Sequence, residues 1–266
     1  MLKLSGVSKT FNPGTVNEKK ALTNVDLRLE RGDFITIVGS NGAGKSTLFN
    51  AISGVFFADA GSIVLDGEDI TFQPEYRRSR EIGRLFQDPM KGTAPHMTIE
   101  ENLSLAYLRT AKNQHAFFAR VGKKDRAFFR EQLAVLNMGL EDRMSQPVGL
   151  LSGGQRQALT LMMATMVPPK LLLLDEHTAA LDPATAEKVL DITRRVVQQH
   201  KITTLMVTHN MKNALELGNR TLMMDSGHVV LDISGEKREK MTVTDLLEQF
   251  KAGAGKDLDN DRILLS

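Results

Sequence analysis

The residues GSNGAGKST, from Gly39 to Thr47, have the pattern of a phosphate-binding loop, in which glycines let backbone N–H groups converge on phosphate oxygens. Lys45 is placed to reach the β- and γ-phosphates of a nucleotide, and the Ser46 hydroxyl is placed to ligate Mg²⁺. The alternative is a glycine-rich turn with a chance Lys-Ser pair. We disfavour it because an apolar run precedes the loop and a helical pattern follows it. The residues expected to contact the nucleotide are Gly39, Ser40, Asn41, Gly42, Ala43, Gly44, Lys45, Ser46 and Thr47.

Two adjacent carboxylates, Asp175 and Glu176, follow the four leucines of residues 171–174. Parallel sheets place ligands at the carboxyl ends of their strands. In phosphate-loop enzymes the first carboxylate supports Mg²⁺, and the second can take a proton from an attacking water. The alternative is a buried strand that ends in an acidic turn, and the complete phosphate loop elsewhere in the chain favours the chemical interpretation.

A second stretch, LSGGQRQALTLMMA at residues 151–164, places a serine and two glycines before a run with helical apolar spacing. This layout suits a helix N-terminus that holds a phosphate, because backbone N–H groups and the helix dipole both favour an anion there. One ATP needs one phosphate loop. The second helix start should therefore not serve the same nucleotide from the same chain.

The elements that must position these residues are those of an α/β protein. Residues 34–38, FITIV, form an apolar run interrupted only by Thr36, which predicts a buried central strand that leads through the phosphate loop into a helix at residues 45–52. Apolar and polar residues alternate over residues 25–30, and a short strand at 61–65 ends in the turn Asp66-Gly67. Together these patterns predict an antiparallel β subdomain near the N-terminus.

Helical spacing dominates residues 88–166, which predicts an inserted α-helical subdomain with a loop or short helix at residues 114–125. We therefore expect an α/β core formed by residues 1–87 and 167–232, followed by a C-terminal helix and tail at 233–266. The further predicted elements are buried parallel strands at 171–174 and 202–207, a crossover helix at 183–200, a hairpin at 220–225 and 228–232, and a short helix at 243–250.

Composition limits the classes of function. The chain has 266 residues, a formal net charge of +2 with both signs mixed throughout, and no cysteine. No large basic field indicates a nucleic-acid partner, so none is expected. The apolar runs are too short or too interrupted to cross a bilayer, and the N-terminus lacks the pattern of a secretory signal. These features predict a cytosolic protein.

Taken together, the motifs GSNGAGKST, LSGGQ, LLLLDE and Ala180-Leu181-Asp182, with His209 after an apolar strand, closely resemble those of the nucleotide-binding subunits of ABC transporters. The resemblance covers about residues 1–232, and LSGGQ is its most specific element. It implies a P-loop NTPase with a RecA-like core, an ABC ATPase domain of residues 1–250, and ATP and Mg²⁺ as ligands.

The resemblance also implies roles for individual residues. Phe11 would stack on adenine, because it keeps the π face of the tyrosine found in many members. Gln87 would touch Mg²⁺ and the attacking water, and His209 would hydrogen-bond to the γ-phosphate. The alternatives are a packed turn residue, a surface-loop glutamine, and a structural or solvated histidine. The implied catalytic residues are Lys45, Gln87, Glu176 and His209, and the implied metal ligands are Ser46, Gln87 and Asp175.

In the family, two subunits pack head to tail around two ATP molecules, which would explain the second helix start. The signature residues Ser152, Gly153, Gly154 and Gln155 of one copy would then face the γ-phosphate held by Lys45 of the other. Asp182 would cross to the partner and help to align its site. The sequence departs from the commonest pattern at His177, where most members have proline. We favour a structural role for this histidine, although titration near the site is the alternative.

Three classes of function compete. The resemblance favours a transporter subunit at the cytoplasmic face of the cell membrane, bound to separate permeases and linked through them to a substrate-binding protein. Residues 145–155, SQPVGLLSGGQ, lack the stretch typical of exporters, which favours import, and an amino acid or similar small solute is the expected cargo. The alternatives are the ATPase of an exporter and a soluble ABC protein that acts on ribosomes or DNA. A non-enzymatic regulator is disfavoured because every catalytic motif is intact.

Overall fold

Period-two alternation of apolar residues builds the first sheet. Strands β1 (Leu2–Phe11), β2 (Lys19–Leu29), β4 (Ala60–Leu65) and β5 (Glu68–Asp69) form four antiparallel strands in the order β2-β1-β4-β5. Leu2 and Leu4 are buried while Lys3 between them is exposed, as expected for a sheet with one covered face. This sheet confirms the predicted N-terminal β subdomain.

The second sheet is built around a strand that is buried over its whole length, β3 (Phe34–Val38). It pairs in parallel with β8 (Thr203–Val207) and with β9 (Arg220–Asp225), and β9 pairs antiparallel with β10 (His228–Ser234). The strand order is β10-β9-β3-β8-β7-β6, with β7 at Leu171–Asp175 and β6 at Ile82–Leu85. The predicted α/β class is therefore confirmed.

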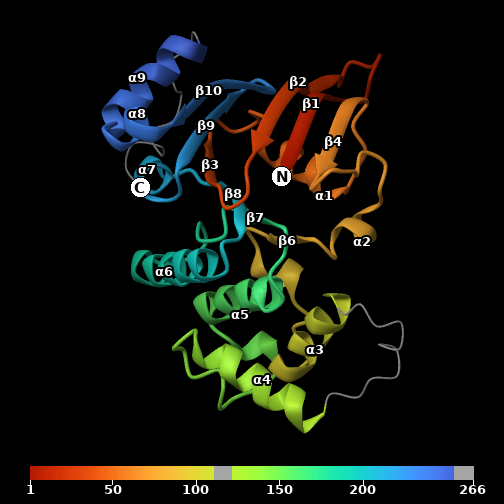
Figure 1. The fold of residues 1–266 in the computed structure, drawn as a ribbon, viewed down its shortest axis with the longest axis vertical. Coiled ribbons are helices and arrows are strands. Elements are labelled where there is room, and N and C mark those ends of the chain that lie inside the picture. The colour runs from red at the N-terminus through yellow and green to blue at the C-terminus, as the bar shows by residue number, and fades with distance from the viewer. Residues whose placement is uncertain (111–121, 255–266) are drawn as a thin grey trace. The chain divides into compact units, whose positions relative to one another are not determined.

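The structure is a computed structural model that describes residues 1–110 and 122–254 (Figure 1). The chain divides into two compact units, and the division passes through β7. The first unit holds residues 1–78, 173–175 and 201–266, and the second holds residues 79–172 and 176–200.

The helices of the first unit are α1 (Lys45–Ser53), α2 (Glu75–Arg78), α7 (Met211–Glu216), α8 (Gly235–Glu239) and α9 (Val243–Ala254). Figure 1 shows α7, α8 and α9 grouped beside β9 and β10. A buried apolar cluster joins α7 and α9 to β3, β9 and β10, and its members are Val38, Met211, Ala214, Met223, Ile233 and Leu246. The C-terminal segment is thus part of the packed first unit.

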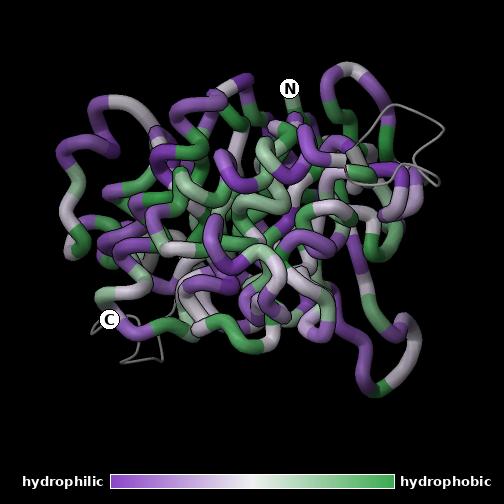
Figure 2. The backbone as a smooth tube through the Cα atoms, turned by 90° about the horizontal axis from the view of Figure 1, so that it is seen from below, coloured by the Kyte–Doolittle hydropathy of each residue, from purple (hydrophilic) through white to green (hydrophobic). Residues whose placement is uncertain are grey.

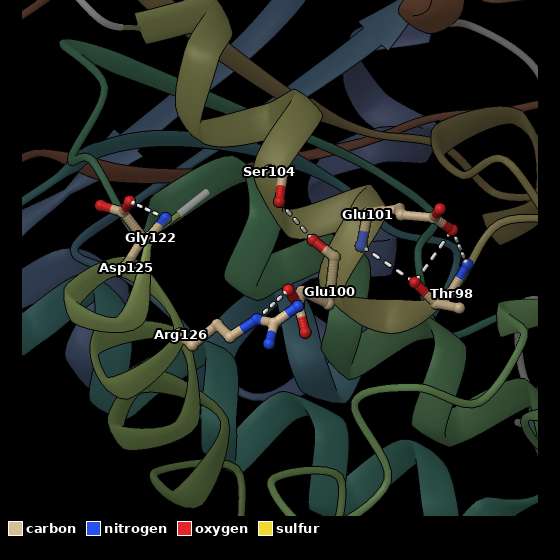
Figure 3. Close-up of polar contacts among 7 residues, drawn as sticks. All are labelled: Thr98, Glu100, Glu101, Ser104, Gly122, Asp125 and Arg126. Carbon is tan, nitrogen blue, oxygen red and sulfur yellow. Dashed lines mark hydrogen bonds and ion pairs between the residues drawn. The ribbon is translucent and has the colours of Figure 1, made fainter. Parts of the chain in front are cut away.

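The second unit is mainly helical. Its elements besides β6 are η1 (Pro89–Gly92), α3 (Ile99–Thr110), α4 (Lys123–Ala134), η3 (Val148–Leu150), α5 (Gly153–Thr165) and α6 (Pro183–His200). Figure 3 shows how polar contacts fix α3: Thr98 and Glu101 cap its start reciprocally, and Glu100 accepts a 2.5 Å hydrogen bond from Arg126 of α4. These contacts fix the start of α3 and connect it to α4.

Hydrophobic and hydrophilic segments interleave along the backbone (Figure 2). Among the helices of the described residues, none combines the length and the apolar character that a membrane span requires.

Most of the predicted elements occur where the sequence places them. The crossover helix spans residues 183–200 as predicted, whereas the second strand of the hairpin continues to Ser234 and the last helix continues to Ala254. Most of the predicted loop or short helix at residues 114–125 lies outside the described residues, and so does the end of the tail, residues 255–266. The predicted domain boundaries stay predictions.

A buried arginine holds the end of the helix that follows the phosphate loop. Arg78 is 2% exposed and donates hydrogen bonds of 2.8–2.9 Å to four backbone carbonyls, two of which, Ala51 and Ile52, belong to the last turn of α1. Burial lowers the pKa of its guanidinium to about 10. Arg78 therefore satisfies carbonyls that would otherwise be buried without partners.

Arg78→Met should lower the free energy of unfolding by about 3 kcal/mol, because four carbonyls lose a charged donor. Arg77→Met, at the exposed neighbouring position of α2, should change it by less than about 0.5 kcal/mol. Urea unfolding followed by circular dichroism measures both. Equal effects of the two substitutions would contradict the structural role of Arg78.

Candidate functional site

The phosphate loop connects the end of β3 to the start of α1 in the first unit. Lys45 is buried, and its ammonium donates to the carbonyls of Gly39 at 2.6 Å and Ser40 at 3.0 Å. Helix α1 begins at Lys45, and its N-cap residue, Gly44, offers no side chain to cap that start. The first N–H groups of a helix have no partner within the helix, so phosphate oxygens could accept from them.

Two positions of the loop, Gly39 and Gly44, require glycine because carbonyl groups of other backbone segments lie against them. A Cβ on Gly39 would lie 2.2 Å from the carbonyl oxygen of Met224, and a Cβ on Gly44 would lie 2.6 Å from that of Ala21. Gly42 has no such neighbour, but its φ of +82° is one that residues with a side chain rarely adopt. The packing of the loop against neighbouring backbone thus accounts for the glycines at positions 39 and 44, and its backbone conformation accounts for the glycine at position 42.

Strand register places His209 beside this loop. Val207 of β8 pairs with Ile37 of β3, and the next residue, Thr208, donates its N–H to the Ile37 carbonyl at 3.1 Å. Gly39 lies two residues after Ile37, and His209 lies two residues after Val207. Both therefore lie at the same carboxyl edge of the two parallel strands. His209 is half-buried there. The sequence-based prediction that it stands near the phosphates is consistent with this register.

The turn between β9 and β10 also touches the loop, a contact that was not predicted from the sequence. Gly227 donates its N–H to the Ala43 carbonyl at 3.0 Å, and its own carbonyl accepts from Thr23 at 3.0 Å. The only sequence signal is the pair Ser226-Gly227, which predicts a turn without indicating its neighbour. This turn therefore helps to fix the shape of the loop.

Phe11 ends β1 and is half-buried. Its ring contacts that of Phe56 edge to face, with centroids 5.4 Å apart, and the ammonium of Lys9 lies 5.8 Å from the Phe11 centroid. Asp59 holds Lys9 in an ion pair of 2.7 Å. The proposed adenine-stacking ring is thus held by neighbours that fix its orientation.

The signature helix α5 lies in the second unit and is capped by its own residues. The Ser152 hydroxyl accepts from the N–H of Gln155 at 3.3 Å, and the Gln155 amide oxygen accepts from the N–H of Ser152 at 3.2 Å. Ser152 and Gly153 are exposed, whereas Gly154 is buried, and a Cβ there would lie 2.1 Å from the Thr185 methyl group. The accessible part of the motif is therefore Ser152 and Gly153.

Asp182 has a local structural role in addition to the one predicted for it. Its carboxylate accepts from the N–H of Thr185 at 3.0 Å, which caps α6 directly before Pro183. Hydrogen bonds with Thr185 lower the pKa of this carboxyl. Asp182 is exposed, so the cap leaves it accessible to a partner.

The two carboxylates occupy the end of β7 as predicted. Asp175 is its last residue, and Glu176 follows with a φ of +48°. This left-handed conformation is uncommon for a residue with a side chain and is found at functional sites more often than elsewhere. Gln87 lies after β6 and is exposed. Asp175 belongs to the first unit and Glu176, Gln87 and the signature to the second.

His177 is structural. It is 1% exposed, and its Nε2 lies 3.2 Å from the Thr193 hydroxyl, which already donates to the Val189 carbonyl. Nε2 is thus suited to donate to this hydroxyl, and Nδ1 is buried with no hydrogen-bond partner among the described residues, which disfavours a second proton on the ring. Burial lowers the pKa of His177 to about 4. This geometry agrees with the role favoured from the sequence.

Comparison with known proteins identifies the family. The profile described as ABC transporter matches residues 22–179. The chain belongs to the ABC transporter family. It is 43% identical to the tyrosine transport ATP-binding protein of Clostridioides difficile (strain R20291), over 94% of this chain and 99% of that relative. It is 36% identical to the choline transport ATP-binding protein OpuBA of Bacillus subtilis (strain 168), over 86% of this chain and 56% of that longer relative.

Solved structures agree. A dimeric ATP-binding cassette in a post-hydrolysis state, bound to ADP and Pi, superposes with a TM-score of 0.76 at 28% identity, over 88% of this chain and 98% of that one. The predicted P-loop NTPase fold and the identification of the chain as the ATPase subunit of an ABC transporter are confirmed. The roles assigned to individual residues stay predictions.

The buried His177 should make stability depend on pH. In the unfolded chain a histidine takes up its proton near pH 6.5, whereas in the folded chain His177 does so near pH 4, so the unfolded state binds more protons between these values. The stability present above pH 6.5 is therefore lost as the pH falls, by up to about 3 kcal/mol at pH 4. His177→Gln should remove this component, and His200→Gln, at the exposed end of α6, should keep it. Identical slopes for the wild type and His177→Gln in urea unfolding from pH 7 to pH 4.5 would contradict the assignment.

Proposed function

We propose that this chain hydrolyses ATP to drive the import of an amino acid through separate membrane permeases, with tyrosine as the first cargo to test. The observation that carries the proposal is the 43% identity to a tyrosine transport ATP-binding protein along nearly the full length of both chains. The preformed phosphate loop supplies the chemistry that such a subunit needs. The cargo is inferred from the relative, because an ATPase subunit does not contact what is transported.

The residues present fit a Mg²⁺ ion bound together with ATP. No group of three or more His, Cys, Asp or Glu in residues 1–110 and 122–254 could hold a metal by itself. This suits Mg²⁺, which takes one or two carboxylates and completes its shell with phosphates and water. The exposed Ser46 and the half-buried Asp175 would hold the ion, with Gln87 as the third ligand. Bound there, the ion would neutralise charge that develops on the γ-phosphate.

Side chains of the protein would bind the phosphates, orient the attacking water and accept its proton. The Lys45 ammonium, held over the loop by two carbonyls, would bind the β- and γ-phosphate oxygens. Glu176 would accept the proton of the attacking water, and His209 would donate a hydrogen bond to the γ-phosphate. Gln87 would orient the water. Ser152 and Gly153 would complete the site from a second copy, because they are the exposed part of an anion-binding helix start.

This arrangement implies a head-to-tail homodimer that closes around two ATP molecules and opens when hydrolysis removes the γ-phosphate. The dimer would act at the cytoplasmic face of the membrane on two permease subunits, with a substrate-binding protein delivering the cargo outside. Export and action on ribosomes or DNA are the alternatives. The similarity to transport proteins of tyrosine and choline supports the first class.

Glu176→Gln should lower ATP turnover at least about 100-fold, because a general base contributes that much, and should leave ATP-dependent dimers intact. Glu187→Gln, at an exposed position of α6, should match the wild type in both respects. A phosphate-release assay and light scattering with and without ATP measure the two properties. A Glu176→Gln variant that turns over at the wild-type rate would show that another group is the base.

A transport assay tests which solute is carried and in which direction it crosses the membrane. With its permease and binding protein in proteoliposomes that contain ATP on the side of this chain, the complex should accumulate labelled tyrosine on that side, and Glu176→Gln should abolish accumulation. ATP-dependent movement of tyrosine in the opposite direction would refute import. Accumulation of another amino acid in place of tyrosine would refute only the cargo, whereas purification of the chain with ribosomes or DNA would refute the transporter assignment.

A further inference from the structure

A second buried arginine, Arg238, holds the helix that follows the proposed γ-phosphate sensor. Arg238 lies on α8 and is 6% exposed. Its guanidinium donates to the carbonyls of Leu217 at 2.6 Å and Ala214 at 3.0 Å, and to the hydroxyl of Thr221 at 2.9 Å. All three acceptors are neutral, and burial lowers the pKa of the group. Placing a cation there therefore costs desolvation energy that these contacts must offset.

The two carbonyls belong to the C-terminal end of α7. Helix α7 spans Met211–Glu216, with Leu217 as its C-cap, and a helix end leaves carbonyls without intrahelical partners. A cation at this end also interacts favourably with the helix dipole. At its other end, α7 is capped by the Asn210 side chain, which accepts from Asn213 at 2.9 Å. His209 is the residue directly before that cap, so one turn and a half of helix separates it from the carbonyls that Arg238 holds.

One carbonyl connects Arg238 to the strand that carries the phosphate loop. The Ala214 oxygen accepts from Thr36 of β3 at 2.7 Å, from Thr221 of β9 at 2.9 Å and from Arg238. Thr36 and Thr221 lie 2.9 Å apart. The Thr221 hydroxyl accepts from Arg238, so its proton is available to the Ala214 carbonyl or to the Thr36 hydroxyl. Arg238 is the group in this network that can only donate. The network thus fixes α7 against β3, which ends at Val38, directly before Gly39.

We propose that Arg238 is a positioning residue for His209: by holding the C-terminal end of α7 against β3 and β9, it fixes where the histidine stands relative to the phosphate loop. The proposal rests on the role given to His209 in the proposed function. It assigns the C-terminal segment, which carries none of the family's motifs, a part in ATP hydrolysis. Arg238 is buried and donates to α7 and β9, and it is not among the residues expected to bind the nucleotide, so its loss should affect turnover more than ATP binding.

Steady-state ATP hydrolysis by the full chain tests the proposal, with Arg238→Met as the variant, because methionine keeps the length and removes the donors. It should lower kcat about tenfold and change KM for ATP less than about twofold, since the phosphate loop stays intact. Arg238→Lys keeps the charge but cannot reach all three acceptors, so it should give a smaller loss in kcat. Hydrogen exchange should show reduced protection of the amides of residues 211–217 in both variants.

The double variant decides whether the effect passes through His209. If it does, Arg238→Met should cause no further loss of kcat in the His209→Ala background, because groups that act as a unit are not additive. A further tenfold loss there, or wild-type kcat in Arg238→Met and Arg238→Lys, would overturn the proposal. Should Arg238→Met not fold, Arg238→Lys with and without His209→Ala decides in the same way. Wild-type kcat in His209→Ala alone would instead refute the role of His209.

A matched control separates positioning from general loss of stability. Ile63→Val removes one buried methyl group from β4, in the four-stranded sheet, whereas β3, which leads into the phosphate loop, belongs to the six-stranded sheet. It should lower the melting temperature and leave kcat unchanged. A fall in kcat equal to that of Arg238→Met would show that lost stability, rather than the position of His209, explains the effect.

Discussion

The close approach of three backbone segments around residues 39–44 is the constraint on which the rest of the structure depends. The loop touches the Met224 carbonyl on one side and the Ala21 carbonyl on the other, at distances that exclude any Cβ. The turn at Gly227 holds the loop through Ala43. The loop therefore takes this shape through contacts with strands from distant parts of the sequence, and in the proposed function that shape lets backbone N–H groups face a triphosphate.

The strands and short helices that contact this loop fix where other residues of the proposed site lie. Parallel pairing of β3 with β8 sets His209 at the same edge as Gly39, and one carbonyl, that of Ala214, joins β3, β9, α7 and Arg238. The second unit carries Glu176, Gln87 and a helix start that caps itself, and the proposed function gives these residues the roles that complement the loop. In the proposed function, the γ-phosphate is bound by the phosphate loop of one chain and by the signature residues of another. Hydrolysis removes that phosphate, and the two subunits of the dimer then separate.

Hydrophobic periodicity and local motifs predicted the elements that have a clear sequence pattern of their own, such as the crossover helix at residues 183–200 and the buried strand at 34–38. Three short helices, α2, α7 and α8, escaped prediction because four to six residues give no readable period and tertiary contacts hold them. Arg78 and Arg238 stand in the charged runs EYRRSR and EKREK, which have the composition of exposed surface. Only the fold shows that one arginine in each run is buried. The individual motifs of the site were readable because they are contiguous, whereas the contacts of Phe11 and Gly227 depend on residues far along the chain.

The central claim is that each ATP site is completed by a second copy of the chain, and mixing two inactive variants tests it most directly. Lys45→Ala removes the phosphate contact, and Ser152→Arg fills the exposed signature start with a bulky cation, so each variant alone should have lost ATP turnover. In a mixed dimer, one site combines both defects, and the other combines an intact phosphate loop with an intact signature. The account predicts that mixing restores turnover, approaching that of one wild-type site per mixed dimer. Turnover that stays at the level of the separate variants, in mixtures shown to form mixed dimers, would contradict it.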